Sequence, residues 1–197
     1  MDWYSIFFFR EGSPTALLYG TYNPWLVALS ALVAIASSIL ALQLTRLSQT
    51  ASVPQRMSLI ASSISLGAGI WSMHFIGMLA YQICTPVTYS PDATLVSMMP
   101  GILASYYALS LMHEKTLSYL QLIKGGVSVG AGIGAMHYTG MLAMQMEPEL
   151  RFDLTWVLIS VVVAVTLATL SLWIGIFLSQ RGKIPARYSI LLGGLLM

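Results

Sequence analysis

Two of the chain's three histidines stand in two versions of one six-residue phrase. Residues 73–78 read MHFIGM and residues 136–141 read MHYTGM. Each phrase places a histidine and a methionine four residues apart, and residues at that spacing share one face of a helix. Each also lies at the end of a long apolar stretch that contains no acidic residue. An ionisable side chain at the end of a membrane helix is by default a candidate functional residue.

The chemistry that these residue types favour is the ligation of a soft metal ion. Thioether and imidazole donors suit copper better than zinc, magnesium or calcium. Such a site could leave a coordination position open for a small diatomic ligand. Eight of the twelve methionines are expected in one layer at the depth of the histidines: Met73, Met78, Met98, Met99, Met136, Met141, Met144 and Met146.

A structural role is the competing interpretation of the same residues. A methionine in a membrane helix usually packs or faces lipid, and a lone buried histidine is usually a hydrogen-bonded structural residue. Two histidines in equivalent places beside methionines keep metal binding open. Cys84 is expected to be an uninvolved thiol, with soft ligation as the alternative, and His113 a solvated loop residue. With no Ser-His-Asp set, phosphate loop or paired carboxylates, we expect no enzymatic activity in this chain.

The composition is that of an all-α membrane protein. The chain is 57% hydrophobic and 8% charged, with a mean hydropathy of +0.78, whereas soluble domains carry about a quarter charged residues. Apolar runs of roughly 18 to 25 residues have the length of bilayer-crossing helices, and backbone in lipid must satisfy its own hydrogen bonds. The dispersed net charge of +2 gives no indication of nucleic-acid binding, and a single cysteine excludes an internal disulfide.

The apolar runs predict a bundle of five full spans plus the start of a sixth. Pro100 lies in the early turns of the third span, where it can be tolerated or can kink the helix. Residues 1–23 are expected to form an outer interfacial segment and not a cleavable signal, because Asp2 stands where a basic region belongs. Residues 24–197 would be the transmembrane domain. The expected spans are about 25–47, 57–81, 94–112, 118–146 and 154–178, with the sixth beginning near 188.

The basic residues predict the orientation. Seven of the nine lie in or beside the loops after the first, third and fifth spans, and positive residues mark the cytoplasmic side. The N-terminus is therefore expected outside, with both phrases near the outer surface.

The chain also repeats itself over longer stretches. Residues 65–69 (SLGAG) match 128–132 (SVGAG) at an offset of 63, and residues 125–129 match 193–197 at an offset of 68. By that second offset a third Met-His pair would begin seven residues past Met197, so we expect the chain to be truncated before a third motif.

A glycine stripe is expected to bring the two phrases together. Gly126, Gly130 and Gly134 are spaced by four, and His137 continues the stripe. Small residues at this spacing let membrane helices approach closely. We therefore expect His74 and His137 on facing helices at one membrane depth.

The phrase at 136–141 is the signature of the MHYT domain, and residues 73–78 resemble its usual first-repeat variant. The resemblance covers the chain from about Tyr22. It implies a sensor module of the bacterial inner membrane, multi-pass with a periplasmic N-terminus, that binds copper and through it oxygen, carbon monoxide or nitric oxide. It also implies a cytoplasmic output domain that makes or degrades cyclic di-GMP, which this chain lacks. Membrane lipids are expected as partners of the chain, with a second copy in a homodimer as a further candidate. The implied ligands are Met73, His74, Met78, Met136, His137 and Met141, with Met144 as a further candidate.

Three other functions remain open on sequence alone. Copper transport would use the methionines to hand an ion across the membrane. Electron transfer could use one haem held between His74 and His137. The repeated phrases could also serve packing alone.

Overall fold

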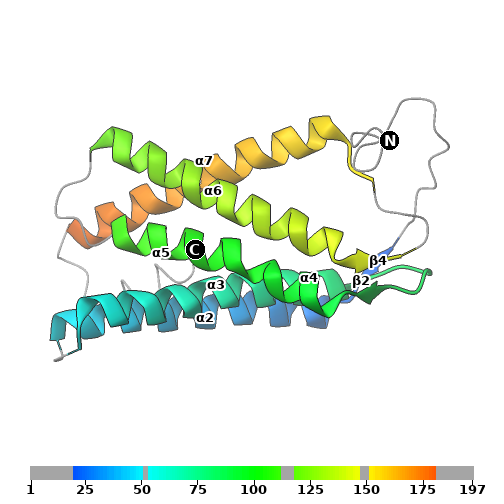
Figure 1. The fold of residues 1–197 in the computed structure, drawn as a ribbon, viewed down its shortest axis with the longest axis horizontal. Helices are drawn as coiled ribbons and strands as arrows, with labels where there is room; N and C mark the ends of the chain where they lie inside the picture. Colours follow the sequence, from blue (N-terminus) through cyan, green and yellow to red (C-terminus); the bar gives the residue numbers. More distant parts are fainter. Residues whose placement is uncertain (1–19, 51–52, 112–117, 147–150, 181–197) are drawn as a thin grey trace.

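The computed structural model describes residues 20–50, 53–111, 118–146 and 151–180. In these ranges long helices lie side by side and are joined at their ends (Figure 1). This arrangement confirms the predicted all-α membrane-type bundle. The helices are α2 (Pro24–Thr50), α3 (Gln55–Ala80), α4 (Pro91–Val96), α5 (Met98–Leu111), α6 (Tyr119–Leu142) and α7 (Leu154–Gln180).

Four segments in the described ranges are long and apolar enough to cross a membrane: 24–45, 55–80, 91–111 and 154–174. Helix α6 is not among them, because its glycines and the polar groups of the second phrase lower its hydropathy. Figure 1 nevertheless shows α6 running between the two ends of the bundle, like its neighbours. The expected start of a sixth span near 188 and most of the expected interfacial segment at 1–23 lie outside the described residues.

The third expected span is divided in two. Helix α4 ends at Val96, Ser97 forms a turn, and α5 begins at Met98. Pro100 has no backbone N–H, so it cannot donate to the carbonyl of Val96, four residues earlier. Of the two outcomes that Pro100 allows, toleration or a kink, the structure has a break in the helix just before the proline.

Polar side chains cap the first turns of α2, α6 and α7. The Asn23 carboxamide oxygen accepts from the backbone N–H of Trp25 at 3.0 Å, and the Asp153 carboxylate accepts from that of Thr155 at 2.8 Å. Ser118 and Gln121 form a capping box at the start of α6. Each cap satisfies backbone donors that a helix leaves unpaired at its first turn.

Helices α2 and α3 pack through small and hydroxylated residues. Thr45 donates to Ser62 at 3.0 Å, and Ser58 donates to the carbonyl of Leu44. A Cβ added at Gly69 would collide with the Ser37 side chain. Such close approach is how membrane helices associate when lipid supplies no hydrophobic drive between them.

Two short antiparallel strand pairs lie at one end of the bundle, beyond the ends of α3 and α6 (Figure 1). In each pair, the strand that follows a phrase helix pairs with a strand that carries the sequence Thr-Tyr. Residues 21–24 (TYNP) and 88–91 (TYSP) are thus a second repeated phrase, which ends in the first turn of a helix. The pairs are β1 (Thr21–Tyr22) with β2 (Tyr81–Gln82) and β3 (Thr88–Tyr89) with β4 (Met144–Gln145).

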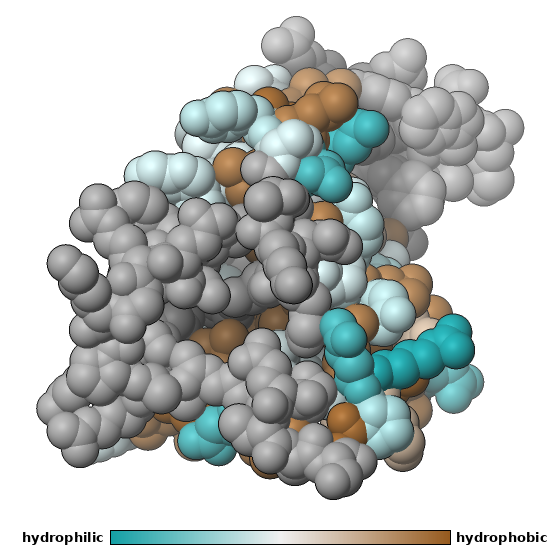
Figure 2. All heavy atoms as spheres, turned by 90° about the vertical axis from the view of Figure 1, so that its left-hand side faces the viewer, coloured by the Kyte–Doolittle hydropathy of each residue, from teal (hydrophilic) through white to brown (hydrophobic). Residues whose placement is uncertain are grey.

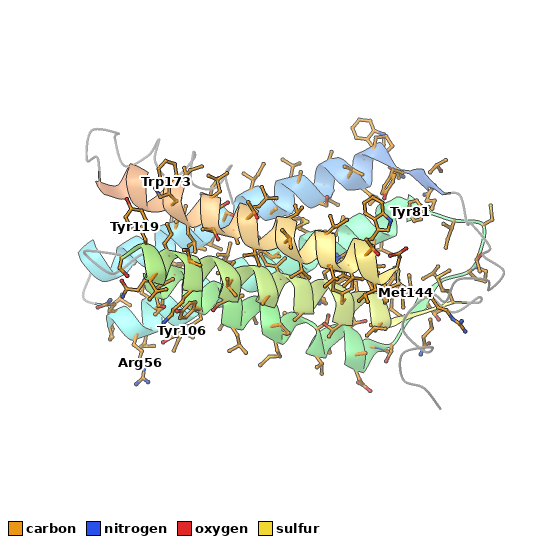
Figure 3. All side chains as sticks on the ribbon, turned by 90° about the horizontal axis from the view of Figure 1, so that it is seen from above. Arg56, Tyr81, Tyr106, Tyr119, Met144 and Trp173 are labelled. Carbon is orange, nitrogen blue, oxygen red and sulfur yellow. The ribbon has the colours of Figure 1, made fainter. Side chains whose placement is uncertain are left out.

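The two ends of the bundle differ. Tyr81 and Met144, which follow the two phrase helices, lie at one end, and Arg56 lies at the other (Figure 3). Figure 2 looks onto the Arg56 end and shows hydrophilic side chains interspersed with hydrophobic ones. Both phrases therefore lie toward the same end of the bundle, as the repeat predicts.

Candidate metal centre

The two phrase histidines touch each other. The Nδ1 atoms of His74 on α3 and His137 on α6 are 3.4 Å apart. Their ring centroids are 4.8 Å apart, with the planes inclined at 62°. The prediction that these residues lie on facing helices at one depth is confirmed.

The spacing of the two Nδ1 atoms fits two ligands of one ion. Hydrogen bonds from N–H donors are typically about 2.7–3.2 Å long, so a pair at 3.4 Å is a weak hydrogen bond. Metal–imidazole bonds are about 2.0–2.1 Å, the zinc value, so two nitrogens on one ion can be up to about 4.2 Å apart. The observed separation lies inside that limit.

The other nitrogen of His74 is enclosed. Its Nε2 atom is buried and has no hydrogen-bond partner. Among the described side chains, the only other buried polar atoms without a partner are the hydroxyls of Thr94 and Ser105. A Cβ added at Gly140 would lie 3.1 Å from this Nε2 and 3.3 Å from the ring tip of Phe75. Gly140 therefore leaves just enough room for the His74 ring against the backbone of α6.

The methionines of the phrases do not all occupy similar surroundings. Met136 is 2% exposed, and its Cγ lies 3.6 Å from the position of a Cβ added at Gly101 on α5. It therefore packs between helices. Met73 and Met78 on α3 and Met141 on α6 are half-buried.

The remaining methionines of the expected layer also differ in exposure. Met144 is half-buried in β4, where it pairs with Tyr89. Met98 and Met146 are half-buried as well, whereas Met99 is 53% exposed. Metal ligation by any of these sulfurs stays a prediction.

No group of three or more histidine, cysteine or carboxylate side chains gathers within the described ranges, and Cys84 is exposed. The donors that the phrases themselves could add to the two imidazoles are thioethers. Such a set suits a soft ion and does not suit zinc, magnesium or calcium.

The glycine stripe of α6 packs against α7. A Cβ added at Gly130 would lie 2.7 Å from the Cα of Val165, and one at Gly126 would collide with Thr169. Nothing lies within 4 Å of a Cβ added at Gly134. The stripe thus places α6 on α7 and not on α3, so the expectation that it brings the two phrases together is wrong. Its last member, one turn before His137, leaves open space.

Trp71 supports the first phrase, a role that sequence reasoning missed. Its indole N–H donates to the carbonyl of Thr94 at 3.0 Å and to the hydroxyl of Ser97 at 3.1 Å. The same ring contacts Phe75, with centroids 4.9 Å apart and the ring planes tilted by 47°. Trp71 therefore links the turn that carries His74 to the break between α4 and α5. A tryptophan three residues before the histidine was the available signal.

Aromatic residues that follow the histidines link each phrase to the next part of the chain. Phe75 contacts Tyr89 of β3 with centroids 5.9 Å apart, and Tyr138 contacts Phe152 at 5.4 Å. Tyr138 also shares a 2.5 Å hydrogen bond with Ser160 on α7. Burial raises the pKa of the Tyr89 phenol above its ordinary value.

The chain belongs to the MHYT family, described as the N-terminal repeat of bacterial signalling proteins. The family matches at residues 18–60, 67–125 and 130–188. The predicted family is confirmed.

Three relatives are much longer than this chain. The chain is 39% identical over 168 residues to the bifunctional diguanylate cyclase/cyclic di-GMP phosphodiesterase MucR of Pseudomonas aeruginosa, covering 85% of this chain and 24% of the relative. It is 32% identical over 201 residues to the cyclic di-GMP phosphodiesterase NbdA of the same organism, covering 100% and 25%. It is 31% identical over 156 residues to the signaling protein YkoW of Bacillus subtilis, covering 79% and 19%. The chain thus spans a quarter or less of the length of these relatives. No solved structure matches it.

Proposed function

We propose that this chain is the ligand-sensing part of a bacterial membrane signalling protein, and that it binds copper between α3 and α6. The observation that carries the proposal is the contact between His74 and His137, one from each copy of the phrase. The half-buried thioethers of Met73, Met78 and Met141 are the additional donors. Copper bound there would supply a position for oxygen, carbon monoxide or nitric oxide.

The chain's own residues would pass a change at this site to the rest of the bundle. His74 shares a helical turn with Trp71, whose indole holds the break between α4 and α5. His137 shares a turn with Tyr138, which holds α7 through Ser160. A shift of either ring would therefore bias the packing of a neighbouring helix, which is the kind of two-state element that a sensor requires.

We propose that this change in helix packing controls a cytoplasmic output domain. The names of two relatives refer to the synthesis or hydrolysis of cyclic di-GMP, and an output domain of this kind would lie outside this chain. The excess of basic residues on one set of loops favours an N-terminus outside the inner membrane. A homodimer remains a prediction.

The geometry is less favourable to haem. If two imidazoles held a haem from opposite faces, each bond from nitrogen to iron would be about 2.0 Å long. The two coordinating nitrogens would then be about 4 Å apart, with the haem between the rings. The two rings here are inclined and in mutual contact, with centroids 4.8 Å apart. Copper transport would need further donors toward the other end of the bundle. Among the residues that the structure describes there, Met57 of α3 is 64% exposed.

Metal analysis and optical spectroscopy of the purified chain test the proposal. We expect about one copper per chain, weak competition by zinc because thioethers favour Cu(I), and a spectral change on adding carbon monoxide or nitric oxide under reducing conditions. Porphyrin absorption without copper would support the haem alternative. Copper that binds and then crosses sealed vesicles would support transport.

A further inference from the structure

We infer that the histidine pair binds its ion through Nδ1 of both rings, and that Gly140 enforces this choice. The inference rests on the proposed copper function. It goes further by assigning the coordinating atoms and a positioning residue, neither of which follows from the phrase itself.

The first step is the orientation of the His74 ring. The edge that carries Nε2 and Cδ2 lies against Gly140, where an added Cβ would be 3.1 Å and 3.3 Å from these two atoms. Nε2 is buried there without a partner. The backbone of α6 therefore closes this edge to a ligand.

The second step is the opposite edge. Nδ1 of His74 faces Nδ1 of His137 at 3.4 Å, within the reach of a single ion. A ligand can thus approach His74 at Nδ1, where it also meets the second imidazole. When both Nδ1 atoms hold lone pairs toward an ion, the protons of the neutral rings are on Nε2.

The third step is a comparison that the repeat provides. Gly77 stands three residues after His74, as Gly140 stands three residues after His137. A Cβ added at Gly77 meets nothing within 4 Å, whereas one at Gly140 meets His74 and Phe75. The two glycines are equivalent in sequence, but only Gly140 lies against an imidazole.

Nitrogen NMR of the histidine side chains tests the coordinating atoms. The chain has three histidines, so the spectrum of ¹⁵N-histidine-labelled protein loaded with Cu(I) is simple to assign. We expect metal-shifted Nδ1 and protonated Nε2 signals for both His74 and His137. Copper bound through Nε2 of either ring would overturn this inference and leave the copper function intact. A chain that binds no Cu(I) would overturn both.

Matched substitutions test the positioning role. Gly140→Val should weaken Cu(I) binding by about 10–100-fold, the usual effect of losing a group that orients a ligand, and should shift the His74 ring signals in metal-free protein. Gly77→Val should change the affinity by less than about twofold, because it fills open space. Equal effects of the two substitutions would contradict the role of Gly140. The smaller Gly140→Ala, which requires the ring to move by only a few tenths of an ångström, provides the same comparison if the valine variant does not fold.

Discussion

The two copies of the phrase share a site but not their surroundings. On α3, Trp71 precedes His74 by one turn and donates to Thr94 and Ser97. On α6, the equivalent position is Gly134, where an added Cβ would meet nothing within 4 Å. The support for His137 comes instead from its neighbour Tyr138, which bonds Ser160 on α7. A repeated sequence thus supplies two similar ligands, while the helices around them give each ligand a different connection to the bundle.

The largest expected difference between similar residues concerns the two methionines of the second phrase. Met141→Leu should weaken Cu(I) binding by at least about tenfold, the lower end of the effect of losing even an outer-shell group. The substitution keeps the side-chain volume roughly constant, so the loss would report the missing sulfur. Met136→Leu is the control, because Met136 is buried against Gly101. A chelator-competition titration measures both affinities, and a greater loss for the Met136 variant would reverse the assignment.

The glycine stripe offers the next comparison. Gly130→Leu should lower the free energy of unfolding by about 1–3 kcal/mol, the usual cost of overpacking, because Gly130 lies against the backbone of Val165. Gly134→Leu should have a much smaller effect, since open space lies beside it. Denaturation in mixed micelles measures both free energies. Equal destabilisation would show that the contact between Gly130 and α7 does not stabilise the bundle.

A smaller effect is expected for the tryptophan that only the first copy has. Trp71→Phe should lower the free energy of unfolding by about 0.5–1.5 kcal/mol, because it removes a net hydrogen-bond contribution of that size. It should also increase hydrogen exchange around Ser97 at the break between α4 and α5. Trp25→Phe is the control, as Trp25 is 83% exposed. Unchanged exchange around Ser97 would mean that Trp71 does not hold the break.

The smallest effect is expected for the tyrosine that only the second copy has. Tyr138→Phe removes the hydroxyl bonded to Ser160, and side-chain hydrogen bonds between membrane helices contribute about 0.6 kcal/mol on average. Ser160→Ala should lower the free energy of unfolding by a similar amount, and the double variant should lose no more than either single one. Additive losses would show that the two hydroxyls act independently.

Much of the fold follows from the sequence because lipid restricts the choices. Run lengths predict α2, α3 and α7 to within a few residues, and Pro100 marks the place where a kink was one of two expected outcomes. The offset of 63 between the phrases is enough to predict that His74 and His137 meet, because equivalent turns in packed repeats lie at equal depth. The strand pairs were missed although TYNP and TYSP repeat, since two-residue strands leave no periodicity.

The parts of the site that could not be predicted depend on contacts between elements. Spacing places Gly130 on a stripe, but only the packing order makes α7 its partner. The phrases make Met136 and Met141 equivalent candidates, yet the close approach of Gly101 buries one of them. The difference between Gly77 and Gly140 likewise depends on which helix faces each glycine.

The central claim is that His74 and His137 bind one ion together, and a double-mutant cycle on Cu(I) binding tests it most directly. The wild-type chain, His74→Ala, His137→Ala and the double variant would each be titrated against a Cu(I) chelator. A shared site predicts one ion per wild-type chain, a large loss in each single variant, and little further loss in the double variant, because the interaction is already gone. Single variants that each retain half of the copper, or a double variant that binds as much as the wild type, would contradict the account.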